Sequence, residues 1–363
     1  MPTATAMVLE SPRKMVRWTF PLPEVGEADA VLRVEACGLC GTDHEQYTGS
    51  MSAGFAFIPG HEIVGVIEEI GPEAVSRWGV NRGDRVAVEV FQTCRACDEC
   101  LSGDYIRCRR YGLRDMYGYV PVETEPALWG GYATHVYLSK DALVLPVPSS
   151  LDPVTATLFN PLGAGIRWGV TLPGTKAGDV VAVLGPGIRG LSALVAAKAA
   201  GAEFVMVTGH GERDRLRLET ATLLGADLVV DVSTTDPAAA LRTAAGRLAD
   251  VVVHVAANAP TALGQATACA AIGATVVVGG MQGDAEGTPG FHPDVLVRKV
   301  LRIVGARGVD ATAYREAIAM LAAGSPLCQV PRLTAGLSGV EDLIHVMAGE
   351  GSEPPPIHGV VTP

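Results

Sequence analysis

The pattern of hydrophobic and polar residues changes near residue 150. Before that point, short segments such as 30–38, 62–71 and 84–91 alternate apolar and polar side chains, and glycine, proline or aspartate turns separate them. Alternation with a period of two predicts strands that bury one face. The first part of the chain is therefore expected to be β-rich and barrel-like.

After residue 150, short apolar runs alternate with helical patterns. The apolar runs, expected to be strands, lie at 179–185, 204–209, 228–232, 250–256 and 274–280. Helices are expected at 152–170 and 191–202, and later from residues 310 and 339. Strands that are apolar on both faces and alternate with helices predict an α/β fold with a parallel, doubly wound sheet. A further strand is expected at 301–308 and a closing strand at 355–363.

Composition limits the classes of function. The chain has 363 residues, 48% of them apolar, and a net charge of -11. This length predicts two domains, and the negative charge argues against nucleic acid or an anionic membrane as a partner. The apolar stretches are short, and the N-terminus lacks the pattern of a signal peptide. These features predict a cytoplasmic protein.

Four cysteines lie within fifteen residues, at Cys94, Cys97, Cys100 and Cys108, with the spacing C-x2-C-x2-C-x7-C. Such a set could close a tetrahedral zinc site, hold an iron–sulfur cluster, or form disulfides in a small secreted domain. Cys108 lacks the following proline of the ferredoxin run, and a large enzyme without a secretory signal keeps its thiols reduced. Structural zinc is the favoured interpretation. A closed four-cysteine site does no chemistry, so the reactive site is expected elsewhere.

Gly185, Gly187 and Gly190 form a G-x-G-x-x-G motif between a predicted strand and a predicted helix. The glycines allow a tight turn and close approach of the backbone to a pyrophosphate, which the helix N-terminus stabilises. Ile188 and Arg189 occupy variable positions, and Arg189 could itself pair with phosphate. A glycine-rich packing turn is the alternative. The strand–turn–helix setting favours an NAD(P) site.

The choice between NAD and NADP depends on the end of the next strand, at Thr208 and Gly209. No carboxylate stands there, and arginines follow closely, beginning with Arg213. This arrangement favours NADP. Glu212 or Asp214 could instead fold back to bind the ribose of NAD, so the preference stays open.

Two further clusters lie upstream, one around Cys37 and Cys40 and one at His61 and Glu62. Cysteine and histidine ligands with an open fourth position make a Lewis-acid zinc that can bind an alcohol oxygen. Either cluster alone could be structural. Their combination with a dinucleotide fold favours a catalytic zinc.

The segment GHEIVGVIEEIGPEA at 60–74 matches the pattern G-H-E-x2-G-x5-G-x2-A, and CGLCGTD at 37–43 resembles a catalytic-zinc segment. With the four-cysteine lobe, these motifs resemble the zinc-containing medium-chain dehydrogenase/reductase family over essentially the whole chain. The resemblance implies a GroES-like catalytic domain and a Rossmann cofactor domain. The catalytic domain is expected at 1–155 and 298–363, with its structural-zinc lobe at about 91–110, and the Rossmann domain at 156–297.

The resemblance also implies the roles of individual residues. Cys40 and His61 are expected to ligate the catalytic zinc, and Glu62 to lie beside it as an outer-sphere or exchanging ligand. Asp43 is expected to accept the other ring N–H of His61 and so to orient it. Thr42 is expected to hydrogen-bond the substrate hydroxyl and to begin the proton path. Cys37 is interpreted as a buried thiol.

The chain departs from the family at two places. Asn160 stands where the family has a third, anionic zinc ligand. An amide oxygen is a weak zinc donor, so either Asn160 binds weakly, or Glu62 or water completes the shell, or the metal is labile. A helix cap is the alternative role of Asn160. The second departure is Glu45, which occupies the place of a relay histidine and leaves His44 as a candidate relay residue.

These motifs predict reversible alcohol oxidation, in which zinc acidifies the substrate hydroxyl and hydride passes to nicotinamide. The substrate, an alcohol, aldehyde or ketone, is not specified further. One alternative is an NADPH-dependent reductase without a functional catalytic zinc; another is a non-catalytic nucleotide-binding protein. The resemblance also implies a homodimer or homotetramer formed through an edge of the Rossmann sheet, for which 274–280 is the candidate strand.

Overall fold

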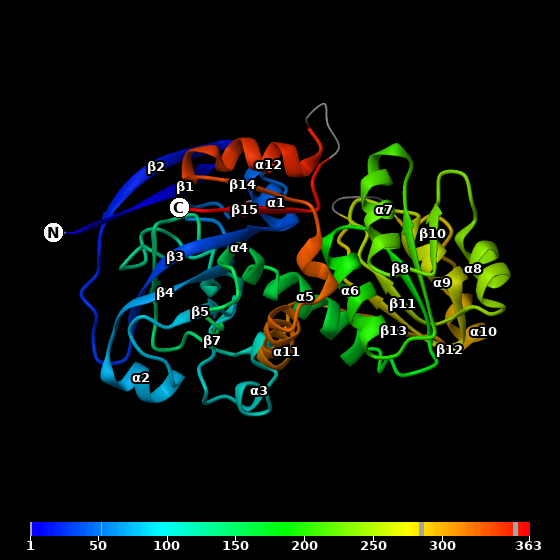
Figure 1. Cartoon of the computed structure of the whole chain (residues 1–363), viewed down its shortest axis with the longest axis horizontal. Helices are drawn as coiled ribbons and strands as arrows, with labels where there is room; N and C mark the ends of the chain where they lie inside the picture. The colour runs from blue at the N-terminus through cyan, green and yellow to red at the C-terminus, as the bar shows by residue number, and fades with distance from the viewer. Residues whose placement is uncertain (1, 52, 283–286, 351–354) are drawn as a thin grey trace. The chain divides into compact units, whose positions relative to one another are not determined.

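The structure is a computed structural model that describes residues 2–51, 53–282, 287–350 and 355–363. It contains two compact units, the first formed by Met1–Asn160 and Asp310–Pro363, the second by Pro161–Val309. Figure 1 labels their elements. None of the described helices combines the length and the apolar character needed to span a bilayer.

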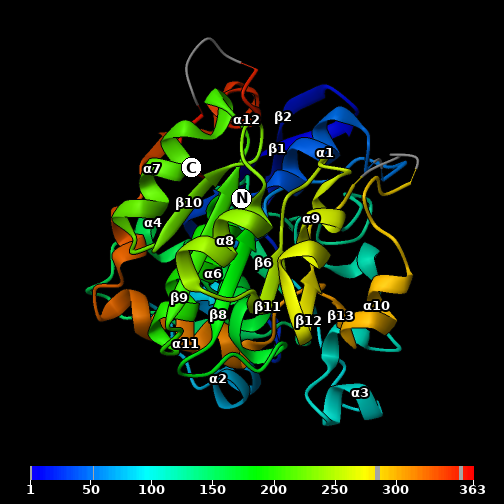
Figure 2. The same ribbon diagram turned by 90° about the vertical axis from the view of Figure 1, so that its right-hand side faces the viewer.

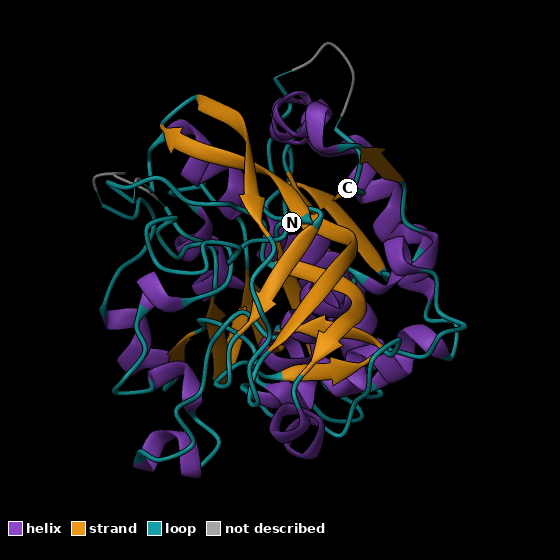
Figure 3. Cartoon of the chain, turned by 90° about the vertical axis from the view of Figure 1, so that its left-hand side faces the viewer, coloured by secondary structure: helices purple, strands orange, loops and turns teal. Residues whose placement is uncertain are grey.

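The first unit is built mainly on antiparallel strands (Figure 3). Its seven-stranded sheet has the order β14-β15-β3-β4-β5-β7, with β6 paired to β3, and β1 and β2 form a separate two-stranded sheet. The expected closing strand is confirmed, because β15 pairs with β3. The strands are β1 (Thr3–Ser11), β2 (Lys14–Pro21), β3 (Ala30–Leu39), β4 (Glu62–Ile70), β5 (Arg85–Val88), β6 (His135–Leu138), β7 (Val144–Pro146), β14 (Arg332–Ala335) and β15 (His358–Val361).

The helices of the first unit are short, apart from α11. They are α1 (Gly41–Thr48), α2 (Pro72–Trp78), α3 (Asp98–Leu101), α4 (Pro153–Ala156), α11 (Ala311–Ala322) and α12 (Val340–Ala348), with single 3-10 turns at Tyr105–Arg107, Leu113–Asp115, Pro326–Gln329 and Leu337–Gly339. Helix α1 follows β3 directly and packs against α12. This connection places the start of α1 beside the sheet that carries the metal-centre residues.

The second unit contains the expected parallel sheet, with six strands in the order β10-β9-β8-β11-β12-β13 (Figure 2). This order is that of a doubly wound dinucleotide-binding fold, in which the strand order reverses between β8 and β11. Every residue of β8 is buried, as its apolar sequence predicts. The strands are β8 (Val180–Leu184), β9 (Phe204–Gly209), β10 (Leu228–Asp231), β11 (Ala249–His254), β12 (Ala270–Val278) and β13 (Arg302–Gly305).

Helices connect these strands in the way that parallel pairing requires. They are α6 (Ile188–Ala199), α7 (Arg215–Leu223), α8 (Pro237–Ala245), α9 (Ala262–Cys269) and α10 (Asp294–Lys299), with a 3-10 turn at Glu212–Asp214. Helix α5 (Phe159–Ile166) begins at the end of the first unit and continues into the second, where a π-helical turn at Arg167–Thr171 follows it.

The helix expected at 152–170 is interrupted, because α4 ends at Ala156 and α5 begins at Phe159. Pro161 explains the break. It lacks an amide hydrogen and fits only the first turn of a helix, so a new helix starts just before it.

Two expectations about β12 and β13 differ from the structure. The strand at 301–308 was assigned to the catalytic domain, whereas β13 pairs with β12 in the parallel sheet. The strand at 274–280 is expected at the sheet edge, whereas β12 lies between β11 and β13, and the two edge strands are β10 and β13. The order of strands in a sheet arises from pairing between distant segments, which the pattern along the chain does not contain.

Candidate metal centres and cofactor site

The end of β3 and the start of β4 bring Cys40, His61 and Glu62 together. Their ligand atoms lie within 4.8 Å of one another, and all three residues are buried. Gly38 is paired with Glu62 across the two strands, and a methyl group on Gly38 would overlap the Glu62 carboxylate. A thiolate, an imidazole and a carboxylate that converge in this way form a donor set that fits zinc.

Asp43 lies in the first turn of α1 and is 1% exposed. Its Oδ2 accepts a hydrogen bond of 2.7 Å from the Cys40 amide, which fixes the carboxylate beside the ligand group. Burial raises the pKa of Asp43 to about 6, although the nearby His61 opposes this effect. Burial lowers the pKa of His61, but its contact with Cys40 and the charge of Asp43 outweigh burial and raise it to about 9. Nδ1 of His61 and Oδ1 of Asp43 are both buried and have no hydrogen-bond partner within the described part of the chain, so the structure does not show the bond expected between this ring and this carboxylate.

The other expected residues of this centre lie close by in the same unit. Thr42 Oγ1 is 3.8 Å from Cys40 Sγ. Asn160 is buried inside the first turn of α5 and donates from Nδ2 to the Tyr314 hydroxyl at 3.0 Å. Asn160 therefore does not cap the helix as an N-cap residue would.

His44 does not point toward the metal centre. Its Nε2 lies 3.0 Å from Glu350 Oε1, beyond the end of α12. Glu45 is half-buried, and burial raises its pKa, with a further contribution from the charge of Cys40. The relay expected through His44 is therefore not supported by the contacts of its side chain.

No sequence motif indicates two buried residues near this centre, Tyr132 and His358. His358 starts β15, and its Nε2 lies 2.9 Å from Thr157 Oγ1. Its ring also borders Gly38, since a methyl group there would be 3.1 Å from His358 Cε1. Burial lowers the pKa of His358 to about 3, so this ring is neutral. Both residues are distant in sequence from the zinc motifs, and only the folding of the sheet brings them near.

The four cysteines also converge, since the sulfur atoms of Cys94, Cys97, Cys100 and Cys108 lie within 4.8 Å of one another. The Cys94 and Cys100 sulfurs are 3.7 Å apart, much longer than the roughly 2.05 Å of a disulfide bond. Amides of Ala96 and Cys97 lower the pKa of Cys94 and so favour its thiolate. This geometry fits a closed, tetrahedral zinc site.

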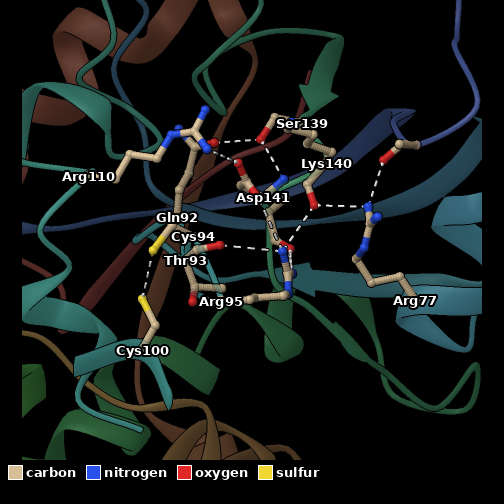
Figure 4. Close-up of polar contacts among 12 residues, drawn as sticks. Arg77, Gln92, Thr93, Cys94, Arg95, Cys100, Arg110, Ser139, Lys140 and Asp141 are labelled. Atoms are coloured by element: carbon tan, nitrogen blue, oxygen red, sulfur yellow. Dashed lines mark hydrogen bonds and ion pairs between the residues drawn. The ribbon is translucent and has the colours of Figure 1, made fainter. Parts of the chain in front are cut away.

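Arg95 connects the four-cysteine lobe to the rest of the first unit (Figure 4). Its guanidinium donates to the carbonyl oxygens of Lys140 at 3.1 Å and Ala142 at 2.6 Å, and lies 3.5 Å from Asp141. The residue itself has a φ of 53°, which few side chains tolerate. These contacts hold the loop after Cys94 in a fixed position.

In the second unit, the G-x-G-x-x-G motif forms the turn from β8 into α6. Gly185 has a φ of +107°, and a methyl group on Gly190 would overlap the Gly185 carbonyl, so both positions require glycine. Gly187 is the N-cap of α6, and a methyl group there would meet nothing within 4 Å. The turn is therefore close-packed on one side and open where a pyrophosphate would approach the helix N-terminus.

Ile188 and Arg189 begin α6, and the Arg189 guanidinium lies 5.1 Å from the centre of the Trp168 ring. Strand β9 ends with Thr208 and Gly209, both buried. A methyl group on Gly209 would come within 3.0 Å of both Asp214 and Pro186, so the strand end is packed closely against the glycine turn.

The acidic residues after β9 have partners within the loop. Asp214 accepts from the His210 amide at 2.9 Å and from Arg217 at 2.9 Å. Glu212 accepts from Arg215 at 2.6 Å. Arg213 occupies an exposed position between them. The carboxylates of Asp214 and Glu212 thus bind residues of the segment that follows β9.

The sequence matches two known domain families. Residues 26–149 match the alcohol dehydrogenase GroES-like domain, and residues 190–323 match the zinc-binding dehydrogenase domain. A Mycobacterium tuberculosis protein named as a probable alcohol dehydrogenase is 62% identical over 359 residues, which cover 99% of this chain and 98% of that protein. A sorbitol dehydrogenase of Bacillus subtilis is 31% identical over 77% of this chain and 76% of its own length.

Solved structures agree with these matches. A zinc-binding dehydrogenase from Sinorhizobium meliloti, bound to NADP, superposes with a TM-score of 0.84 at 27% identity and covers 100% of both chains. An alcohol dehydrogenase from Thermotoga maritima, at 22% identity and a TM-score of 0.87, shares the fold. With the two domain matches and the near-complete alignment to its relative, the chain belongs to the zinc-containing alcohol dehydrogenase family of medium-chain dehydrogenases/reductases.

Proposed function

We propose that this protein is a zinc-dependent alcohol dehydrogenase that transfers hydride between an alcohol or carbonyl substrate and NAD(P). The observation that carries the proposal is the buried group of Cys40, His61 and Glu62, in a chain that also has a dinucleotide-binding turn. An open zinc site polarises an alcohol, and a nicotinamide accepts its hydride. Both requirements of the reaction are thus represented in one chain.

The two units divide this work. We assign the catalytic centre and the four-cysteine lobe, at about 91–110, to the unit formed by Met1–Asn160 and Asp310–Pro363. The cofactor is assigned to Pro161–Val309, which contains the complete parallel sheet. Structural zinc in the lobe would stabilise the loops that its four cysteines connect.

Each residue near the catalytic centre has a chemical task. When bound, zinc supplies Lewis-acid polarisation of the substrate oxygen. Cys40 and His61 would hold it, with Glu62 as an exchanging ligand, and Asp43 would orient the His61 ring. Thr42, whose Oγ1 lies 3.8 Å from the Cys40 sulfur, would accept a hydrogen bond from the substrate hydroxyl. It would thereby begin the path along which the hydroxyl proton leaves.

Asn160 is proposed as a weak, neutral partner of the same zinc. Its Nδ2 donates to Tyr314, which fixes the rotation of the amide. While Glu62 is not bound, Cys40 would be the single anionic ligand, so this donor set would leave more of the metal's charge to acidify an alcohol but would hold the metal less tightly. If Asn160→Ala leaves zinc occupancy and turnover unchanged, this role is wrong.

A metal count combined with an activity panel tests the proposed function. About two zinc ions per chain, together with turnover of primary or secondary alcohols, would support it. About one zinc ion, with reduction of activated double bonds or carbonyls by NADPH, would instead indicate a reductase without catalytic zinc. Cofactor binding without turnover on any substrate would indicate a non-catalytic nucleotide-binding protein.

We further propose a preference for NADP. Asp214 and Glu212 bind residues of their own loop, whereas the exposed Arg213 follows β9 where a 2′-phosphate would lie. Replacement of Arg213 by alanine should weaken NADPH binding about tenfold and leave NADH binding nearly unchanged, because one charge-assisted contact is lost. Fluorescence titration with both cofactors measures the effect. Arg215→Ala, which removes an arginine paired with Glu212 and Glu219, is the control.

Finally, we propose that the protein acts on small molecules as a homodimer or homotetramer, in which two copies associate along β13. One side of β13 pairs with no described strand, and exposed apolar residues precede it in the chain, with Val297 81% and Val300 69% exposed. An apolar edge of this kind is a template for pairing with a second chain.

A further inference from the structure

The Trp168 ring lies at the carboxyl edge of the parallel sheet. It belongs to the π-helical turn after α5 and is 7% exposed. Its Nε1 donates to the Gly308 carbonyl oxygen at 3.0 Å, in the segment that follows β13. A methyl group on Gly279, the first residue after β12, would lie 3.2 Å from Trp168 Cε3. The indole is therefore fixed against the segments that leave β12 and β13.

This part of the sheet is the nicotinamide side of the expected cofactor site. A doubly wound sheet has two mononucleotide-binding halves, and a dinucleotide lies across the carboxyl ends of the strands where their order reverses. Here the order reverses between β8 and β11. The half formed by β8, β9 and β10 carries Arg213, which we assign to the 2′-phosphate of the adenosine. The half formed by β11, β12 and β13, on which Trp168 packs, is left for the nicotinamide nucleotide.

Arg189 starts at the glycine turn and reaches the Trp168 ring. It is the second residue of α6, and its guanidinium carbon lies 5.1 Å from the centre of the ring, the distance of a cation–π contact. The turn that carries Trp168 packs closely on α6, because a methyl group on Gly169 would lie 3.2 Å from Ala193 Cβ. A planar guanidinium stacks on an aromatic face, so Trp168 holds the charge of Arg189 on the nicotinamide side.

The two oxidation states of the cofactor differ in charge on that side. The nicotinamide ring of NAD(P)+ is positively charged, and it becomes neutral when it accepts hydride. The pyrophosphate and the adenosine are the same in both states. A cation beside the nicotinamide ring therefore weakens binding of the oxidised form relative to the reduced form, whereas a cation on the pyrophosphate strengthens both equally.

We propose that Arg189, held by Trp168, lies beside the nicotinamide ring and makes the protein bind the reduced cofactor more tightly than the oxidised cofactor. Trp168 is then the positioning residue of Arg189. The inference rests on the dinucleotide site of the proposed function but not on its catalytic zinc. Tighter binding of the reduced form favours hydride transfer to the bound cofactor, because binding shifts an equilibrium toward the form that is bound better.

Isothermal titration calorimetry with NADP+ and with NADPH, in the absence of substrate, tests the proposal. The measured quantity is the ratio of the two dissociation constants, oxidised over reduced. Arg189→Met should lower this ratio about tenfold, because one nearby charge changes an affinity by about that factor at the effective dielectric of a protein. Arg189→Lys keeps the charge and should keep more of the ratio than Arg189→Met.

Three results would overturn the proposal. The first is an unchanged ratio in Arg189→Met, with both affinities as in the parent. The second is equal weakening of both forms, which is the effect of a lost phosphate contact. The third is the same ratio in Arg189→Lys and Arg189→Met, since the charge would then not be the cause.

Arg213→Met is the matched control, because it removes the same charge from the adenosine half of the same unit. It should leave the ratio unchanged even where it weakens both affinities, since the adenosine half is identical in the two oxidation states. If Arg213→Met lowers the ratio as much as Arg189→Met does, net charge rather than position is the cause and the proposal is wrong.

Trp168→Met tests the positioning role. Without the aromatic face the guanidinium is no longer held, so the ratio should fall about threefold, the size of one cation–π contact. The same substitution in an Arg189→Met background should leave the ratio unchanged. An equal fall in that background would show that Trp168 does not act through Arg189. If Trp168→Met fails to fold, the two Arg189 variants still test the proposal.

The proposed function and this inference can fail separately. Zinc is counted in every variant, so that a change in the ratio is compared at equal metal content. A parent without catalytic zinc or turnover would contradict the function, and calorimetry would still measure the ratio. An unchanged ratio in Arg189→Met would contradict the inference, and turnover by the parent would still support the function.

Discussion

At the scale of single residues, the metal centre depends on two glycines as well as on its ligands. Gly38 leaves the space that the Glu62 carboxylate fills, and Gly60, at a φ of +88°, leaves the space for Tyr132. The ligands themselves are buried, so their neighbours have little freedom to move aside. The centre is therefore expected to be sensitive to the addition of one methyl group.

Gly38→Ala tests this sensitivity. The added methyl group would overlap Glu62, so we expect loss of zinc from the catalytic centre and a fall of about 1–3 kcal/mol in the free energy of unfolding. Gly41→Ala is the control, because a methyl group there would meet nothing within 4 Å. Metal analysis and urea unfolding measure both variants, and equal behaviour would show that Glu62 can move without consequence.

Glu89 illustrates how burial sets a pH dependence. It is 0% exposed, and its Oε2 accepts from Tyr105 of the four-cysteine lobe at 2.6 Å. Burial raises its pKa from 4.5 to about 8, although the bond from Tyr105 opposes this change. Because the folded pKa is above the unfolded one, the stabilising contribution of the protonated acid is complete below about pH 4.5. That contribution is lost as the pH rises toward 8.

Glu89→Gln keeps the neutral form at every pH. The parent should therefore lose stability relative to this variant between pH 5 and pH 8, by at most about 1.4 kcal/mol per pH unit. Urea unfolding across this range measures the difference. The exposed Glu24→Gln is the control for the change in net charge. A difference that stays constant with pH would contradict the role assigned to burial.

At the scale of elements, the cofactor turn combines two kinds of glycine. Gly190 faces the Gly185 carbonyl closely, whereas Gly187 faces open space at the N-terminus of α6. The first contact maintains the packing of helix on strand, and the second leaves room for a ligand. One motif thus serves stability and binding at different positions.

Two substitutions should separate these roles. Gly190→Ala should lower the melting temperature by several degrees, because the methyl group would overlap the Gly185 carbonyl. Gly187→Ala should fold with nearly parental stability but bind NADPH about tenfold or more weakly, because its methyl group would stand in the approach of the pyrophosphate. Calorimetry and fluorescence titration measure the two effects. If both variants lowered stability equally, Gly190 would not have a packing role separate from the binding role of Gly187.

At the scale of the whole molecule, the position of β13 affects both the fold and the association. Its pairing with β12 completes the parallel sheet and leaves one side of β13 as the sheet edge. Ile303, in the middle of β13, is 38% exposed. This edge is the surface on which we expect a second copy to bind.

Ile303→Lys should therefore shift the protein toward monomers, since a charged side chain on an edge strand opposes pairing. Leu223→Lys on α7 is the control, because Leu223 is 86% exposed and lies away from β13 in sequence and in the sheet order. Sedimentation velocity measures the distribution of species. An unchanged distribution for Ile303→Lys would place the interface elsewhere.

The residue pattern predicted the parallel sheet, the β-rich unit and the four-cysteine cluster, whereas the roles of Cys40, His61 and Glu62 were implied by the family resemblance. This was possible because the motifs for these features are local: a period of two, a glycine turn between strand and helix, and closely spaced cysteines. The interruption of the helix before Pro161 was missed, although proline chemistry could have indicated it. The partner of Asn160 could not be predicted, because Tyr314 is distant in the sequence.

The sequence by itself determined the fold class, the family and the candidate ligands Cys40, His61 and Glu62. Only the tertiary structure decided that β13 forms an edge of the parallel sheet, that His44 faces Glu350 and that the Tyr132 ring packs on Gly60. The physical reason is the range of the interactions involved. Turns, caps and periodicity act between residues a few positions apart, whereas strand order and buried polar neighbours arise from pairing across the whole chain.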